Sequence, residues 1–162
     1  MFRKDDHERR EIDVNGLIRE TITLVHGEIE SQQAVLKMDL LESSPTIVGE
    51  NVPLQQVLIN LIINALDAMS TVKDREHVLS VKSHTNERGD VLISVADSGT
   101  GIAPENAGRV FEPFFTTKSH GLGMGLSICR SIVEAHSGRL LASSALPHGC
   151  IFHIHLPSGP SQ

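Results

Sequence analysis

Two glycine clusters frame a stretch of the chain whose residue types could bind a phosphorylated ligand. Residues 97–102 read DSGTGI, residues 121–126 read GLGMGL, and the segment between them has too little apolar periodicity for a long helix or strand. Glycine lets the backbone approach a ligand closely, and a helix that begins at the second cluster would direct free N–H groups at an anion. A long loop of this kind in a compact domain is usually functional or disordered. We therefore predict a nucleotide site closed by a flexible lid.

Asp97 follows an apolar segment at the point where a strand is expected to end. A carboxylate there can accept a hydrogen bond from an exocyclic amine such as that of adenine, and it would repel a carbonyl group in the same place. An Asp followed closely by Gly, as in Asp97-Ser98-Gly99, is also common in ordinary turns. The residue by itself is therefore compatible with adenine recognition and with a purely structural turn.

The second glycine cluster offers a place for phosphate. Gly121, Gly123 and Gly125 precede a predicted helix, without the lysine-serine pair of a P-loop. Backbone N–H groups at the start of that helix could hold a phosphate, and the flexible ammonium of Lys118 could reach it. A mobile surface loop with a solvated lysine is the alternative interpretation of the same pattern.

A polar stripe runs along an otherwise apolar helix predicted for residues 53–69. Asn60 and Asn64 are four residues apart and Asp67 is three further on, so the three lie within roughly 60° of one another at about 100° per residue. Asn is a poor residue for a helix interior, and a buried amide must be satisfied. Its oxygen suits Mg²⁺, which keeps several waters and takes other ligands from phosphates. A solvated helix face is the alternative.

Apolar spacing predicts the elements that position these residues. Helices are expected over residues 14–29, 53–69 and 126–136, and Gly138 stands at a suitable C-cap position for the third helix. Strands are expected at residues 12–14, 35–41, 47–48, 78–83, 91–96, 139–143 and 150–156. Adjacent strands are joined by short turns, and a regular βαβ alternation is absent. The pattern predicts an α+β sandwich with helices on one face of a mixed, mostly antiparallel sheet.

Composition narrows the classes of partner. The chain has 162 residues, 40% of them hydrophobic, which suits one domain with a real core. A net charge of −6 and five aromatic residues, all Phe, argue against nucleic acid as a main partner. The chain has no apolar run of transmembrane length and no secretory signal, so we expect a cytoplasmic domain, or the cytosolic part of a membrane-bound protein, without direct membrane contact. The isolated domain is expected to be a monomer. Cys129 and Cys150 are expected to be reduced core residues.

The sequence pattern predicts where three histidines lie. His153 and His155 alternate with apolar residues of the last strand, so they are expected on its outward face, where no third metal ligand is evident. His136, at the end of the third helix, is expected to contact the last helical carbonyls. We do not predict a metal site at any of these three histidines.

Four segments, in order, resemble the motifs of sensor histidine kinases. Residues 56–65 resemble the N box, residues 97–102 the first glycine box, residues 111–118 (FEPFFTTK) the F box, and residues 121–138 the second glycine box with its helix. The resemblance covers residues 12–157 and is closest to the nitrogen-regulatory and oxygen-sensing type of two-component kinase. It implies the Bergerat fold, an α/β sandwich with a flexible ATP lid that gyrase, mismatch-repair and heat-shock-chaperone ATPases share.

The same resemblance implies that ATP and Mg²⁺ are the ligands. Asn64 would bind the metal, Asn60 would line the phosphate region, and Asp97 would read adenine, while Lys118 would join the two asparagines as a catalytic group. Asp67 falls where many relatives carry a basic or other polar residue, so its role stays open. The remaining nucleotide contacts would come from Gly99, Gly101, Ile102, Thr116, Thr117, Gly121, Leu122, Gly123, Gly125 and Leu126.

The phosphoacceptor motif of these kinases, a His followed by an acidic residue, a basic residue and Pro on a long helix, has no match here. His7 is followed by Glu, but no Pro is near, and too few residues precede Asn60 for the helical hairpin that the family places there. We therefore expect three parts: the end of a connection from dimerisation helices (residues 1–11), a catalytic and ATP-binding domain (12–157) and a disordered tail (158–162).

The implied activity is transfer of the ATP γ-phosphate to a histidine on a separate dimerisation domain, for relay to a response regulator. Such a transfer needs positioning and charge neutralisation more than covalent help from the protein. A stand-alone ATPase of this fold would carry a Glu in place of Asn60, because an amide cannot accept a proton from the attacking water. That ATPase and a catalytically inactive nucleotide-binding module are the alternatives. The isolated domain is not expected to phosphorylate itself.

Overall fold

A computed structural model describes residues 9–106, 109–112, 125–145 and 147–158 of the chain. Its main sheet has five strands in the order β2-β4-β5-β7-β6, and only the β2–β4 pair is parallel. The predicted mixed, mostly antiparallel sheet is therefore confirmed. The strands are β2 (Val35–Asp39), β4 (Val78–Thr85), β5 (Val91–Asp97), β6 (Arg139–Ser144) and β7 (Cys150–Leu156).

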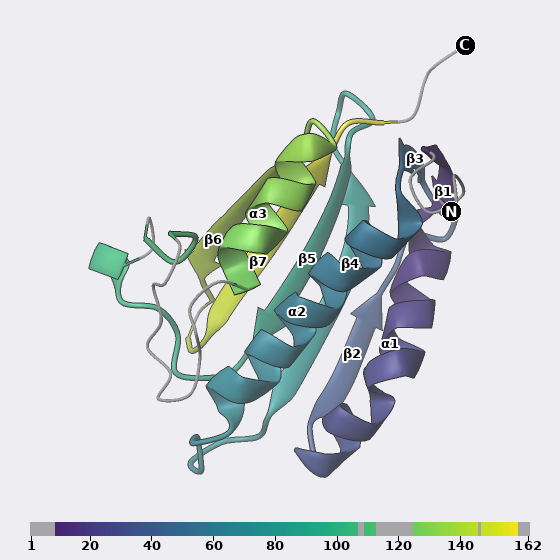
Figure 1. Ribbon diagram of the computed structural model, residues 1–162. Helices are drawn as coiled ribbons and strands as arrows, with labels where there is room; N and C mark the ends of the chain where they lie inside the picture. Colours follow the sequence, from purple (N-terminus) through teal and green to yellow (C-terminus); the bar gives the residue numbers. More distant parts are fainter. Residues whose placement is uncertain (1–8, 107–108, 113–124, 146, 159–162) are drawn as a thin grey trace, which may run out of the picture.

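Helices α1, α2 and α3 all pack on one face of this sheet, and a small two-stranded sheet closes one end of the layer (Figure 1). The small sheet pairs β1 with β3 in antiparallel register, and β1 begins two residues before the strand expected from residue 12. The α+β architecture follows the prediction. The bounds are β1 (Arg10–Asp13), α1 (Val14–Ser31), β3 (Thr46–Gly49), α2 (Asn51–Met69), α3 (Gly125–Ala135) and a short 3₁₀ turn, η2 (Pro104–Asn106).

Helix α2 lies between α1 and α3 and forms the centre of the helical layer (Figure 1). By length and hydropathy alone it could cross a membrane, which differs from our expectation that no such segment exists. Its apolar side chains are buried against the sheet and the other helices, as expected for a core helix. The buried residues are Leu54, Val57, Leu58, Leu61, Ile62, Ala65, Leu66 and Met69.

Period-two alternation along β7 decides which face of the sheet each side chain occupies. Phe152, Ile154 and Leu156 are buried in the core, while His153 and His155 lie partly exposed on the opposite, helix-free face. The predicted orientation of these histidines is confirmed. In the part of the chain that the structure describes, no group of three or more His, Cys, Asp or Glu side chains could hold a metal ion.

The end of α3 differs in detail from the prediction. Ser137, not Gly138, adopts the left-handed conformation, with φ of 63°. The N–H groups of Ser137 and Gly138 donate to the carbonyls of Glu134 and Val133, both at 2.9 Å, which is a Schellman motif. Gly138 is needed for space, because a Cβ there would lie 2.4 Å from the carbonyl oxygen of His155.

Candidate nucleotide site

Asp97 ends β5, the central strand of the sheet, and only 5% of its surface is exposed. Its Oδ1 accepts a hydrogen bond from the N–H of Gly99 at 2.8 Å. Burial raises the pKa of Asp97 above its usual value, and hydrogen bonds from the backbone of Gly99 and Cys150 oppose that shift. The chain thus carries a buried carboxylate at a strand end, where it is oriented by backbone amides.

The backbone after Asp97 packs directly on the C-terminal end of α2. The N–H of Thr100 donates to the carbonyl of Ala68 at 3.2 Å. A Cβ on Gly99 would lie 2.5 Å from the same carbonyl oxygen, so only glycine fits this approach. Because Ala68 lies one turn beyond Asn64, the fold brings the first glycine box next to the part of α2 that carries the asparagines.

Gly149, in the turn between β6 and β7, also packs against the end of β5. It has φ of +99°, and a Cβ there would lie 1.8 Å from the carbonyl oxygen of Asp97. The neighbouring Cys150 is buried, and burial together with the Asp97 carboxylate raises the pKa of its thiol to about 12. Cys129 and Cys150 are both free, as expected.

The two asparagines of α2 have different surroundings. Asn60 Oδ1 accepts a hydrogen bond from Gln56 Nε2 at 2.9 Å, and its Nδ2 donates to Cys129 Sγ on α3 at 3.6 Å. Asn64 is half-buried, and no described residue makes a hydrogen bond with its side chain. Asp67, further along the same stripe, is exposed. Asn64 therefore presents a polar group without a protein partner among the described residues.

The remaining predicted contacts divide into described and undescribed residues. Ile102 and Leu126 pack partly buried against the core, Gly101 has φ of +80°, and Gly125 is the first residue of α3. Phe111, the first residue of the F box, is buried, and its ring centroid lies 6.0 Å from that of Phe152. Outside the described residues lie Thr116, Thr117, Lys118, Gly121, Leu122 and Gly123, together with most of the predicted lid.

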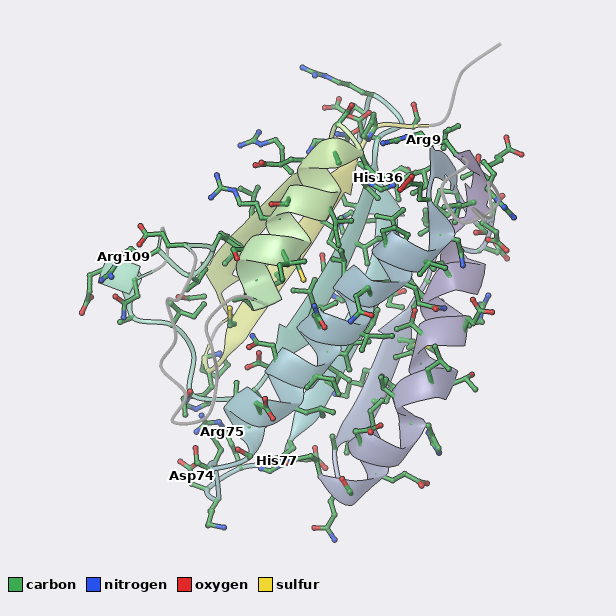
Figure 2. The ribbon with its side chains drawn as sticks, in the orientation of Figure 1. Arg9, Asp74, Arg75, His77, Arg109 and His136 are labelled. Carbon is green, nitrogen blue, oxygen red and sulfur yellow. The ribbon has the colours of Figure 1, made fainter. Side chains whose placement is uncertain are left out.

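At the other end of the helical layer, His136 links α3 to α2 (Figure 2). Its Nε2 accepts a hydrogen bond from the N–H of Glu50 at 3.0 Å, so Nδ1 carries the proton and donates to the carbonyl of Ile132 at 2.8 Å. The predicted contact with the last helical carbonyls is present. The Glu50 contact was not predicted, because nothing in the local sequence pairs these residues.

A sequence model of the family described as "Histidine kinase-, DNA gyrase B-, and HSP90-like ATPase" matches residues 49–160. The catalytic domain of histidine kinase ThkA superposes with a TM-score of 0.82 at 31% identity, over 94% of this chain and 99% of that one. The chain belongs to this family, as a histidine kinase catalytic domain.

Other relatives of this histidine kinase catalytic domain are sensor proteins. TdiS from Thauera aromatica is 34% identical over 155 residues, which are 95% of this chain and 28% of TdiS. FixL from Bradyrhizobium diazoefficiens is 36% identical over 156 residues, 96% of this chain and 30% of FixL. The chain thus spans less than a third of these curated relatives. A structure of ThkA in complex with the response regulator TrrA matches with a TM-score of 0.80 at 29% identity, over 94% of this chain and 42% of that one.

Proposed function

We propose that this domain binds Mg²⁺-ATP and presents the γ-phosphate to a histidine on a dimerisation domain, from which a response regulator receives it. The observation that carries the proposal is the buried carboxylate of Asp97, held beside the end of α2 by the amides of Gly99 and Cys150. A charged acceptor in a buried position selects strongly for a ligand that donates a hydrogen bond, such as the exocyclic amine of adenine.

The asparagines of α2 support the metal part of the proposal. The half-buried side chain of Asn64, without a described partner, offers an oxygen ligand to Mg²⁺, whose other ligands would come from phosphate and water. When bound, the ion neutralises charge on the phosphates. Asn64 would hold it, and Asn60, one turn earlier, would line the phosphate region. Lys118 and the glycines of the second box are proposed to hold the phosphates, as expected from the sequence.

Residue type at position 60 favours transfer to a protein group over hydrolysis. The side chain of Asn60 donates to Cys129 and accepts from Gln56, and an amide cannot remove a proton from a water molecule. In the proposed mechanism, any general base comes from beside the acceptor histidine. The domain's part is to bind the nucleotide, orient it and expose its γ-phosphate.

The organisation of the whole protein is also part of the proposal. Residues 12–157 are proposed as the catalytic domain, to which β1 adds Arg10 and Glu11. ThkA is a histidine kinase with a structure in complex with a response regulator, and its similarity to this chain supports a partner of the same class. We place the domain in the cytoplasm, where ATP and response regulators are found, and expect it to be a monomer in isolation.

Binding of ATP by the isolated chain tests this proposal. Calorimetry is expected to show one ATP site that needs Mg²⁺ for full affinity, and Asp97→Ala should abolish binding without unfolding the domain. A matched control is Asp39→Ala, which removes an exposed carboxylate from the edge strand β2. Incubation with γ-labelled ATP should leave the isolated chain unlabelled. Unchanged affinity of the Asp97→Ala variant, or strong self-labelling of the chain, would contradict the proposal.

A further inference from the structure

Arg75 makes a two-point contact with the backbone that follows Asp97. It lies in the connection between α2 and β4, and 23% of its side chain is exposed. Nε donates to the carbonyl of Ser98 and Nη2 to the carbonyl of Gly99, both at 2.8 Å, while Nη1 contacts Asp74 Oδ1 at 2.9 Å. Figure 2 shows Asp74 and Arg75 together beyond the end of α2 where the first glycine box packs. All three guanidinium nitrogens are thus engaged.

The two carbonyls belong to the peptide groups that orient the site. A trans peptide group is planar, so its C=O and N–H point in opposite directions and move together. In the Ser98–Gly99 peptide, Arg75 holds the oxygen and the N–H donates to Asp97 Oδ1. In the next peptide, Arg75 holds the oxygen of Gly99, and the N–H of Thr100 donates to Ala68. Arg75 therefore fixes both planes from the side opposite to Asp97 and α2.

The loop that carries Arg75 is itself anchored. The ring nitrogens of His77 lie 3.2 Å and 2.7 Å from the carbonyl oxygens of Gln32 and Val72. The hydroxyl of Ser98 accepts a hydrogen bond from the N–H of Val78 at 2.9 Å and contacts the carbonyl of Glu76 at 2.8 Å. These contacts hold the connection against the end of α1, the end of α2 and the first glycine box. The backbone that carries Arg75 is therefore fixed in place.

Arg75 contacts the site through its geometry, because its guanidinium donates to the backbone carbonyls of Ser98 and Gly99. Burial raises the pKa of Asp97, and hydrogen bonds from the backbone of Gly99 and Cys150 oppose that shift. The rigid fork of arginine can donate to two successive carbonyls at once, whereas lysine has a single nitrogen on a flexible chain. Loss of the fork would leave the Gly99 amide free to rotate away from the carboxylate.

We propose that Arg75 is a positioning residue that sets the selectivity of the site for adenine, by fixing the peptide groups that orient Asp97. This inference rests on the proposed role of Asp97 in reading the adenine amine. Arg75 itself does not contact the nucleotide. It determines how well the carboxylate is aligned with the amine, and therefore how strongly the site rejects a base that has a carbonyl group there.

The test compares ATP with inosine triphosphate, which carries a carbonyl in place of the adenine amine. Affinities for both are measured by calorimetry for the wild type, Arg75→Ala and Arg75→Lys, with apo thermal unfolding of each. Arg88→Ala is the matched control, since Arg88 is exposed in the β4–β5 turn. We expect the ratio of ATP to inosine triphosphate affinity to fall about tenfold in Arg75→Ala, the size expected for a misaligned charge-assisted hydrogen bond. Arg75→Lys should show a similar fall, and Arg88→Ala none.

A role limited to stability gives a different result. In that case Arg75→Ala lowers the unfolding temperature but keeps the wild-type ratio, and the inference is overturned. Restoration of the ratio by Arg75→Lys would overturn the two-point contact as its basis. If the wild type binds both nucleotides equally, adenine reading by Asp97 fails, and the inference fails with it. If the ratio collapses in Asp97→Ala but is unchanged in Arg75→Ala, only the inference fails.

Discussion

The ring of His136, at the end of α3, accepts a hydrogen bond at 3.0 Å from the backbone N–H of Glu50, which precedes α2. The two helices that carry proposed site residues are therefore joined at the end away from Asp97. Next to it, Arg9 donates to the carbonyl of Ala135 at 2.6 Å (Figure 2). The segment that enters the domain thus touches the end of α3, whose first residue is Gly125 of the second glycine box.

The first prediction concerns this junction. His136→Ala removes a buried ring and leaves the N–H of Glu50 without its acceptor. It also opens a cavity beside Gly49, because the ring packs so closely there that a Cβ on Gly49 would lie 2.7 Å from it. We expect a loss of about 2–4 kcal/mol in the free energy of unfolding, measured in denaturant. His148→Ala, at an exposed position, is the control and should change stability by less than about 0.5 kcal/mol. Equal losses for both variants would contradict the assigned role of His136.

The second prediction is that Asp97 reduces stability while it supports binding. Burial raises the pKa of the folded carboxyl above the unfolded value of 3.8, so its favourable contribution exists below that value and is lost as pH rises through the folded pKa. At neutral pH the buried charge is therefore destabilising. Asp97→Asn should unfold at the same or a higher temperature than the wild type at pH 7, and its ATP affinity should fall by about 2–4 kcal/mol.

The pH dependence provides the check on that assignment. The difference in unfolding temperature between Asp97→Asn and the wild type should narrow as pH falls toward 4, because the wild-type carboxyl takes up its proton. Thermal unfolding of the apo proteins between pH 4 and pH 8 measures this difference. A variant that is less stable at neutral pH and still binds ATP like the wild type would disprove both parts of the prediction.

The third prediction concerns the metal. Asn64→Ala removes the oxygen proposed to bind Mg²⁺, so ATP affinity measured with and without Mg²⁺ should become nearly equal. Gln55→Ala is the matched control, because Gln55 lies on the α1 side of the same helix, where it donates to Glu20. If Asn64→Ala keeps the wild-type dependence on Mg²⁺, the metal assignment is wrong.

The fourth prediction compares two glycines. Gly149→Ala should destabilise the domain strongly and abolish ATP binding, because the new Cβ would collide with the carbonyl of Asp97 and φ is positive. Gly27→Ala is the control, since Gly27 lies in α1, where an added Cβ would enter open space. It should stabilise the domain by about 0.5–1 kcal/mol. Denaturant unfolding of both variants gives the comparison, and tolerance of alanine at position 149 would refute the close approach.

The spacing of apolar residues predicted the helices and strands, because it shows which face of each one is buried. The alternation along β7 placed Phe152 and His153 on opposite faces, as found. The spacing of the asparagines predicted one face of α2, and Asn60 and Asn64 are both half-buried there. The resemblance to histidine kinases supplied the family, which the comparisons confirm.

Contacts between distant segments were not predictable in the same way. The parallel pairing of β2 with β4 and the contact between His136 and Glu50 depend on how whole elements pack. In the contact between Arg75 and Ser98 a side chain donates to a backbone carbonyl. Every residue has a backbone carbonyl, so the sequence does not indicate which one a side chain will contact. Gly149 stands in a short turn, and no local pattern in the sequence shows that the carbonyl of Asp97 lies beside it.

The most direct test of the proposed function is transfer of phosphate to histidine. The domain is mixed with the dimerisation helices of its parent kinase and γ-labelled ATP, and the label is followed on both polypeptides. The proposed function predicts acid-labile label on a histidine of the helices, little release of free phosphate, and no transfer by Asn64→Ala. Rapid release of free phosphate with unlabelled helices would contradict it and identify a stand-alone ATPase, while ATP binding without either product would identify an inactive nucleotide-binding module.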